Sequence, residues 1–238
     1  MRRFYKEVSV DDGLRILLDG KPIKTPMRKT LALPTHALAE AVAEEWRGQG
    51  DKIVSATMPL TKLANTAIDR VVAREAAIAE QILAYANDLL CYRAEAPDDL
   101  VARQNKSWNP ILDWAAERYA PLTVGTGVGY VAQPGESVDA LRKALAERDA
   151  FALTALHAAA TLCGSLILAL ALADGRLDAE ETFALSQLDE RYQAEKWGAD
   201  EEAQTRARAL AGELAAAARF ISLARSDTGH PHPSTSSG

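Results

Sequence analysis

Cysteine is scarce in this chain, which has Cys91 and Cys163 among its 238 residues. Both lie among apolar neighbours and far apart in the sequence, so we expect two buried thiols and no disulfide framework. Paired cysteines at metal-binding spacing, a His-Glu-x-x-His motif and the Gly-x4-Gly-Lys-Ser/Thr loop that wraps phosphates are all missing. The sequence therefore predicts a protein that is not an enzyme, with no catalytic residues, no metal and no cofactor.

Positive charge is also in deficit, because 27 lysines and arginines stand against 33 aspartates and glutamates and the formal net charge is -6. The cations are interleaved with carboxylates, whereas a nucleic-acid surface needs lysine and arginine clustered to face phosphates. We therefore expect no nucleic-acid partner.

The N-terminus lacks the apolar run of a secretory signal and becomes acidic too early for a transit peptide, which favours the cytoplasm. One long run, 151–173, has no acidic or basic residue apart from His157 and is long enough to cross a bilayer, which takes about 20 residues. Thr154, Gly164 and Ser165 interrupt it, and neither end has an aromatic belt or a basic flank. We expect one helix buried in a soluble protein, with His157 as a core histidine and no stable membrane insertion.

Near the start of the chain, polar and apolar residues alternate over 4–10 and 14–18, which predicts the two strands of a hairpin. Asp11-Asp12-Gly13 between them supplies the turn. Segments 21–26 and 29–34 contain prolines, which cannot donate to a central ladder, so we expect them to form short edge strands. Together these segments predict a small antiparallel β unit.

From Thr35 onward the apolar residues recur at helical spacing. Pro97 with two aspartates opens a helix in which Pro110 is expected to cause a kink or a restart, and Asp178 with Glu181 has the spacing of a capping box. Ser137 is expected to cap another helix. The predicted helices cover about 35–47, 59–71, 74–90, 97–119, 137–148, 151–173, 178–197 and 200–224.

The fold class that follows is α+β, with a small N-terminal antiparallel β unit followed by a larger, mainly α-helical domain. We assign residues 1–57 to a β-rich domain with one helix and residues 58–226 to a helical domain. The tail, 227–238, is polar and broken by prolines, so we expect it to be disordered.

Carboxylates, cations and two large aromatic residues are concentrated in residues 188–198. Tyrosine and tryptophan offer contact area at low entropic cost and charges set orientation, so this composition is typical of a surface that binds another macromolecule. The alternative is a solvated helix face with Trp197 folded back at its end. On a helix, Asp189, Gln193 and Lys196 share one face, and Glu190 and Trp197 share another. The candidate partner-binding residues are Asp189, Glu190, Tyr192, Gln193, Lys196 and Trp197.

Other distinctive residues are interpreted as structural. The glycine run 125–129 neither follows a clear strand nor opens a long helix, so we expect a flexible turn and not a dinucleotide loop. His157 could work with Thr161 or Cys163, but on an apolar helix it lacks the orienting partner that base catalysis requires. The tryptophans expected to pack in the interior are Trp46, Trp108 and Trp114.

Short motifs recur in one order along nearly the whole chain: Arg3-Phe4-Tyr5-Lys6, Lys24-Thr25-Pro26, Glu45-Trp46, Cys91-Tyr92-Arg93, Trp108-x-Pro110-Ile111 and Tyr192-Gln193-x-x-Lys196-Trp197-Gly198. In combination they resemble the ATP12 family of F1-ATPase assembly chaperones. The resemblance implies an N-terminal β unit followed by a helical domain, in agreement with the pattern of the residues.

This resemblance also implies a function. Such a protein binds the free α subunit of F1-ATPase and shields the surface that later meets a β subunit, until the β subunit replaces it. We expect it to act as a monomer. No mitochondrial targeting segment is seen, which implies a bacterial member in the cytoplasm or a mature form in the mitochondrial matrix.

Two other classes of function stay open at this point. An enzyme could use an unrecognised site near Glu190 and Tyr192, between the β unit and the helices, and a membrane-associated factor could be built around residues 151–173. Turnover that fell in Glu190→Gln would support the first class. Carbonate-resistant membrane association would support the second.

Overall fold

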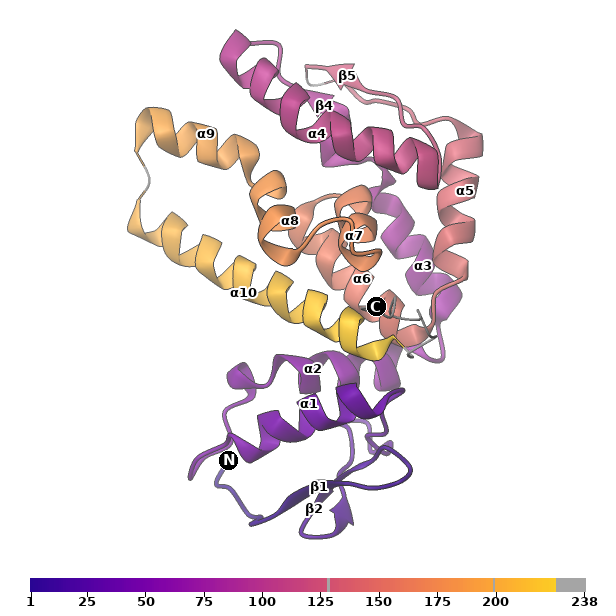
Figure 1. Ribbon diagram of the computed structural model, residues 1–238, viewed down its shortest axis with the longest axis vertical. Helices are drawn as coiled ribbons and strands as arrows, with labels where there is room; N and C mark the ends of the chain where they lie inside the picture. Colours follow the sequence, from indigo (N-terminus) through magenta and orange to yellow (C-terminus); the bar gives the residue numbers. More distant parts are fainter. Residues whose placement is uncertain (128, 199, 226–238) are drawn as a thin grey trace, which may run out of the picture.

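The computed structural model describes residues 1–127, 129–198 and 200–225, in which a small antiparallel sheet precedes a larger array of helices (Figure 1). The sheet lies at one end of the molecule together with the first helices, and the remaining helices lie at the other end. The expected α+β class is confirmed. The division into two domains at residue 57 stays a prediction, and the tail 227–238 lies outside the described residues.

Three short strands pair in the order β1-β2-β3, each antiparallel to its neighbour, as the hairpin pattern predicts. Alternation buries Ile16 and Leu18 on one side of the sheet. Of the two proline-containing segments, 21–26 supplies the two-residue strand β3 and a bridge from Lys24 to Thr30, whereas 29–34 makes only isolated bridges within the described chain. The strands are β1 (Val8–Val10), β2 (Ile16–Leu18) and β3 (Lys21–Pro22).

Helix α1 (His36–Arg47) packs against β1 and β2. Thr35 caps it by accepting a hydrogen bond from the backbone N–H of Leu38, which is fully buried. Near the other end, the hydroxyl of Tyr5 donates to the carbonyl of Trp46 over 2.7 Å, and the two rings meet edge to face with centroids 5.8 Å apart. Trp46 therefore fixes α1 to the N-terminal segment, as expected.

Most later helices begin at the predicted signals. Asp98 follows Pro97 at the start of α4, Asp178 and Glu181 form the capping box of α8, and Asp200 caps α10. The elements after α1 are η1 (Ser55–Thr57), α2 (Pro59–Thr66), η2 (Ala67–Val71), α3 (Glu75–Leu83), η3 (Ala84–Ala86), η4 (Leu89–Cys91), β4 (Tyr92–Arg93), α4 (Asp98–Arg118), β5 (Gly125–Thr126), α5 (Gly135–Ala146), α6 (Ala150–Cys163), α7 (Leu166–Ala173), α8 (Ala179–Ser186), α9 (Leu188–Trp197) and α10 (Glu201–Ala224).

The prediction of one helix over 151–173 is wrong. Gly164 adopts a left-handed conformation, with φ of 63°, and ends α6, and the side chain of Ser165 then caps α7 by accepting from the backbone N–H of Leu168. Two helices of 14 and 8 residues result. No helix in the described part of the chain combines the length and apolarity needed to span a membrane.

Four other expectations need correction. Pro110 lies inside one continuous helix, α4, so the proposed restart does not occur. Ser137 lies within the first turn of α5, where its hydroxyl donates to the carbonyl of Pro121. Gly125 forms part of β5, which pairs in parallel with β4, so the glycine run is not simply a turn. The helix predicted over 74–90 ends at Leu83 and continues as short 3-10 turns.

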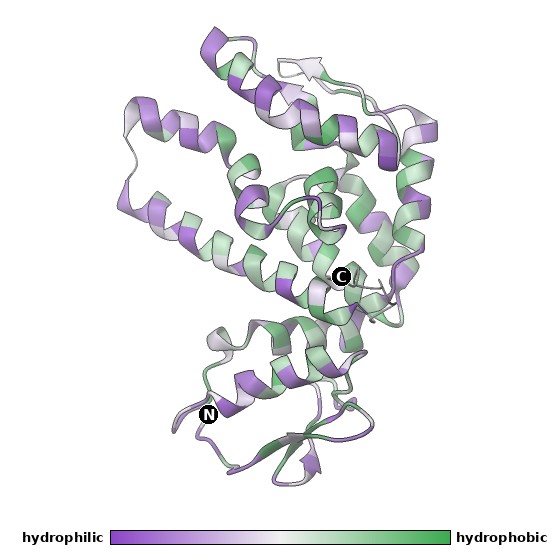
Figure 2. Cartoon of the chain, in the orientation of Figure 1, coloured by the Kyte–Doolittle hydropathy of each residue, from purple (hydrophilic) through white to green (hydrophobic). Residues whose placement is uncertain are grey.

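The apolar interior runs through α6 and α7, which are strongly hydrophobic in Figure 2, whereas α9 is mostly hydrophilic. All eight residues of α7 are buried. Trp108 is fully buried and its ring N–H donates to the carbonyl of Leu185, as expected for a core residue. Trp114 is partly buried against the core. His157 is only half-buried, so it is not the core histidine that we predicted.

Both cysteines are buried and free, which confirms the expectation. Burial raises the pKa of Cys91 and of Cys163 to about 12, so both thiols are protonated at neutral pH. Neither has the lowered pKa of a nucleophilic cysteine.

Candidate functional site

We expected residues 188–198 to form the last turns of a long helix that begins near Asp178. The structure shows instead that they form a separate helix. Gln187 separates α8 from α9, and α9 runs to Trp197 before Gly198. In Figure 1 α9 lies beside α4 on one flank and above α10 on the other. Only Leu188 and Tyr192 of its ten residues are buried. The remaining residues must therefore be stabilised by polar contacts or by water.

One face of α9 is held against α4 by side chains. Asp99 at the start of α4 accepts a hydrogen bond from the hydroxyl of Tyr192 over 2.7 Å, and its other oxygen lies 3.0 Å from the ammonium of Lys196. One turn further along α4, Gln104 donates from its amide to the carboxylate of Asp189 over 2.8 Å. The α4–α9 latch is our name for the five residues that make these three contacts, which are Asp99, Gln104, Asp189, Tyr192 and Lys196.

The latch has a clear electrostatic effect. Hydrogen bonds from Tyr192 and Lys196, with the ammonium charge, hold the pKa of Asp99 below its usual value. The same carboxylate raises the pKa of Lys196 and that of Tyr192. Both charged partners are about half exposed, with side-chain exposures of 50% and 54%. Water screens such pairs strongly, so the latch orients α9 and adds little stability.

A neighbouring ion pair continues this seam. Arg103 of α4 donates to both carboxylate oxygens of Glu195, over 2.9 and 2.8 Å. Its guanidinium also lies over the ring of Tyr192, 5.3 Å from the centroid. The side of α9 that faces α4 is therefore occupied by contacts within the chain.

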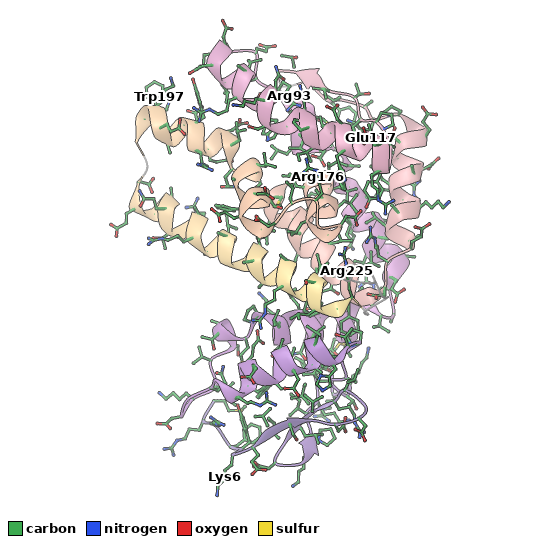
Figure 3. The ribbon with its side chains drawn as sticks, in the orientation of Figure 1. Lys6, Arg93, Glu117, Arg176, Trp197 and Arg225 are labelled. Carbon is green, nitrogen blue, oxygen red and sulfur yellow. The ribbon has the colours of Figure 1, made fainter. Side chains whose placement is uncertain are left out.

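The other side of α9 faces outward. Glu190 is exposed and borders an apolar groove of about 280 Å³ between α8, α9 and α10. Trp197 is 83% exposed, at the free end of α9 (Figure 3), so it is not folded back as the alternative interpretation required. Gln193 is exposed as well. The residues that line the groove are Phe183, Gln187, Glu190, Arg191, Ala194, Ala203, Gln204, Arg206, Ala207 and Leu210.

The structure thus separates the candidate residues into two sets. Asp189, Tyr192 and Lys196 bond to α4, whereas Glu190, Gln193 and Trp197 are exposed. Helical spacing correctly separated Glu190 and Trp197 from Asp189 and Lys196, but placed Gln193 with the latter pair. Glu190 borders the groove beside α10 while the hydroxyl of Tyr192 points to Asp99, so these two do not share a site as the enzyme alternative required. Within the described ranges, no three His, Cys, Asp or Glu side chains group as a metal site.

Comparison with known proteins agrees with this architecture. Residues 2–116 match the family described as ATP12 chaperone protein. The crystal structure of Atp12 from Paracoccus denitrificans is 44% identical, with a TM-score of 0.89, and the match covers 94% of this chain and 98% of that one. The chain belongs to the ATP12 family of F1-ATPase assembly chaperones.

Two other relatives extend the comparison. A crystal structure from Agrobacterium tumefaciens is 43% identical with a TM-score of 0.89, and the match covers 93% of this chain and 85% of that one. The mitochondrial protein atp12 of Schizosaccharomyces pombe is 26% identical over 219 residues, which are 85% of this chain and 75% of the relative. The ATP12 assignment thus covers α9 and α10 as well as the residues matched by the family description.

Sequence reasoning missed two parts of this ATP12 surface. In the sequence Asp99 stands out only as an acidic residue of the first turn of α4, and Gln104 carries no distinctive signal, although both hold α9 in place. The groove also depends on small residues of α10, Ala203 and Ala207, four positions apart on one face. That spacing of alanines was the available signal, but it is common to any helix with an apolar stripe.

Proposed function

We propose that the protein binds the free α subunit of F1-ATPase and covers the surface of that subunit that later meets a β subunit. The β subunit would then displace the chaperone as F1 assembles. Membership of the ATP12 family supports a role in F1 assembly. The choice of the α subunit rests on the family resemblance and is the part that experiment must test.

We assign the contact with the client to α9 because of the exposed residues and the groove on its outward side. Glu190 lines an apolar groove, and Gln193 and Trp197 are exposed on the same helix, while the opposite side is attached to α4. A subunit interface exposed before assembly is rich in apolar area, and an apolar groove with an exposed tryptophan can cover such area. A fully exposed tryptophan gains the most from being buried by a partner.

The latch suggests how the surface is kept ready for binding. Asp99, Tyr192 and Lys196 fix the orientation of α9, so Trp197 and Glu190 are held in position before the client arrives. Because the latch is half exposed, it orients the helix without a large energetic barrier to adjustment. We infer moderate affinity, which a chaperone that must be displaced requires.

Capture of the α subunit tests this proposal. The protein is expressed with an affinity tag in cells that lack assembled F1, and co-purified subunits are identified by mass spectrometry. We expect the α subunit with the wild-type protein, and capture reduced by about tenfold or more in Trp197→Ala and in Glu190→Lys, as for a central interface residue. Failure of the wild-type protein to capture the α subunit would overturn the proposal.

Matched substitutions separate a site effect from a general one. Tyr130→Ala removes another aromatic side chain that is 79% exposed, and Glu117→Lys makes the same charge change on α4. Glu117 and Trp197 lie at opposite sides of the view in Figure 3. Both controls should capture the α subunit normally. Normal capture by Trp197→Ala and Glu190→Lys would reject α9 as the contact and leave the client assignment intact.

We further infer that the protein acts as a monomer, and that it works where F1 is assembled, in the bacterial cytoplasm or the mitochondrial matrix. The relatives named Atp12 include one from a bacterium, Paracoccus denitrificans, and a mitochondrial one. Light scattering on the purified protein tests the first point. A stable dimer would contradict it, and would require the groove to be examined as a contact between copies.

A further inference from the structure

A second pocket lies where α4 ends beside α5, on the opposite side of Figure 1 from α9. Its volume is about 480 Å³, which is within the range of roughly 300 to 1,000 Å³ found for ligand pockets. The pocket is lined by Arg118, Tyr119, Ala140, Lys143, Ala144, Glu147 and Arg148. We call it the Arg118–Lys143 pocket.

Asp174, which follows the last residue of α7, lies close to several of the cations at this pocket. Its carboxylate accepts from the hydroxyl of Tyr119 over 2.6 Å and from the guanidinium of Arg148 over 2.9 Å. Arg118 lies 3.4 Å away, and Arg225, labelled in Figure 3, lies 4.0 Å away. Although burial opposes it, these donors and charges hold the pKa of Asp174 below its usual value, so the carboxylate stays ionised.

Positive charge exceeds negative charge here, unlike in the chain as a whole. Four cations meet at Asp174 and along the pocket, against the two carboxylates of Asp174 and Glu147. The full chain carries a formal charge of -6. An excess of cations in a concave site on an acidic protein raises the local concentration of anions. Lys143 does not pair with Asp174, and Arg118 and Arg225 lie 3.4 and 4.0 Å from it, farther than the 2.9 Å hydrogen bond from Arg148.

Two of these cations keep donors available to a ligand. Arg118 is 59% exposed, and its contact with Asp174 is made only by its Nε, at 3.4 Å. By comparison, Arg148 donates to the same carboxylate over 2.9 Å. Lys143 is exposed and makes no ion pair with any described residue. Both side chains line the same pocket, one from the end of α4 and one from α5. A ligand with two anionic groups can pair with both at once.

The aromatic ring in the lining helps to define the ligand. The guanidinium of Arg118 lies over the ring of Tyr119, 5.2 Å from its centroid, and Trp114 contacts the same ring edge to face at 5.7 Å. One face of Tyr119 is therefore taken by Arg118, so a nucleotide base could stack there only by displacing the guanidinium. The pocket supplies charge and volume while that face is occupied, which favours carboxylates on a flexible chain over a nucleotide.

We propose that the Arg118–Lys143 pocket binds an acidic segment of a protein partner, whose neighbouring carboxylates pair with Arg118 and Lys143. Arg148, which also lines the pocket, donates hydrogen bonds to Asp174 and Tyr119. The proposal does not depend on which subunit binds at α9, and the two residues that pair with the ligand lie on α4 and α5.

Fluorescence anisotropy with a labelled oligo-glutamate peptide tests it on the full chain. We expect saturable binding that weakens with salt, and a loss of affinity of about five- to tenfold in the double variant Arg118→Gln/Lys143→Gln, the effect of two partly exposed ion pairs. The matched control Lys106→Gln/Arg208→Gln removes two exposed cations outside the pocket and should bind as the wild type does. Thermal melts should show that both double variants fold.

Three outcomes would overturn the proposal. The first is no binding of the peptide by the wild-type protein. The second is an equal loss in the control variant, which would mean general charge attraction. The third is competition by inorganic phosphate at concentrations equal to those of the peptide's carboxylates, which would make the pocket a site for small anions. An oligo-glutamine peptide should not bind, and α-subunit capture by the pocket variant is measured separately so that the two proposals fail independently.

Discussion

Helices α7 and α9 lie close together in the chain but are stabilised in opposite ways. All eight residues of α7 are buried, whereas α9 buries only Leu188 and Tyr192. Burial of apolar side chains contributes about 1.5 to 3 kcal/mol each, while half-exposed polar pairs contribute little. The first helix therefore stabilises the fold, and the second leaves its surface available for a partner.

The starts of the two helices differ in the same way. The backbone N–H of Ile167 donates to the buried carboxylate of Asp88, and that of Leu168 donates to Ser165. Asp88 also accepts from the N–H of Leu90, so one buried side chain joins η4 to α7. By contrast, Gln187 at the start of α9 makes no capping hydrogen bond from its side chain. Hydrogen bonds at its N-terminus therefore fix α7, whereas α9 is oriented mainly by side-chain contacts with α4.

The largest expected effect follows from truncating α7. Leu168 is completely buried, so Leu168→Ala removes apolar contacts and leaves a cavity. We expect the free energy of unfolding to fall by about 3 to 5 kcal/mol. Urea denaturation followed by circular dichroism measures it. Trp197→Ala is the counterpart on α9 and should change stability by less than about 0.5 kcal/mol, because the side chain is exposed. Equal losses in the two variants would refute the comparison.

A pH-dependent effect is expected at Asp88. Burial raises its pKa from 3.8 to about 6 although backbone N–H groups oppose the rise. A carboxyl whose pKa is higher in the folded state contributes stability below the unfolded value and loses it as pH rises through the folded value. Relative to Asp88→Asn, the wild-type protein should thus lose on the order of 2 to 3 kcal/mol between about pH 4 and pH 7.

The difference in unfolding free energy between wild type and Asp88→Asn, measured across that range, isolates this group, since other carboxyls cancel. Asp113→Asn, an exposed aspartate on α4, serves as control and should show no such trend. An advantage of the wild type that grew with pH would mean that the N–H groups of Leu90 and Ile167 outweigh burial.

A smaller effect is expected at the turn between α6 and α7. Gly164 has a φ of 63° and open space around the position of an added Cβ, so Gly164→Ala creates backbone strain without a clash. We expect a loss of about 1 to 2 kcal/mol in unfolding free energy. Gly135→Ala at the start of α5 also meets open space, without a positive φ, and should be neutral or slightly stabilising. If both variants behaved alike, the left-handed turn would not be what separates the helices.

This turn also marks where sequence reasoning reached its limit. The apolar content of 151–173 predicted a buried helical segment correctly, but hydropathy carries no information on φ, so Gly164 and Ser165 were treated as polar dilution of one helix. The capping box of Asp178 and Glu181 was predicted because both halves of that signal lie within one turn of chain. Capping signals within one turn of chain could thus be predicted from the sequence, whereas the end of a helix inside an apolar run could not.

The candidate site shows the same limit between local and distant partners. Helical spacing separated Glu190 from Asp189, since that depends only on 100° per residue. The helix that packs against α9 is revealed by the contact between Tyr192 and Asp99, which are 93 positions apart in the sequence. A single sequence gives no signal for such a pairing. The residues of α9 could therefore be named in advance, while the division between latch and outward surface required the fold.

The smallest expected effect concerns the latch and sharpens the contrast most. Asp99→Ala removes the acceptor of both Tyr192 and Lys196, so α9 should open locally more often while α7 is unaffected. Amide hydrogen exchange followed by mass spectrometry should show exchange about two- to threefold faster over α9, as for the loss of a screened ion pair, and unchanged over α7. Asp98→Ala, one residue earlier in the same first turn, controls for the change in α4 itself. Faster exchange in α7 as well would mean that the latch supports the whole fold, and α9 would then be as structural as the helix it is contrasted with.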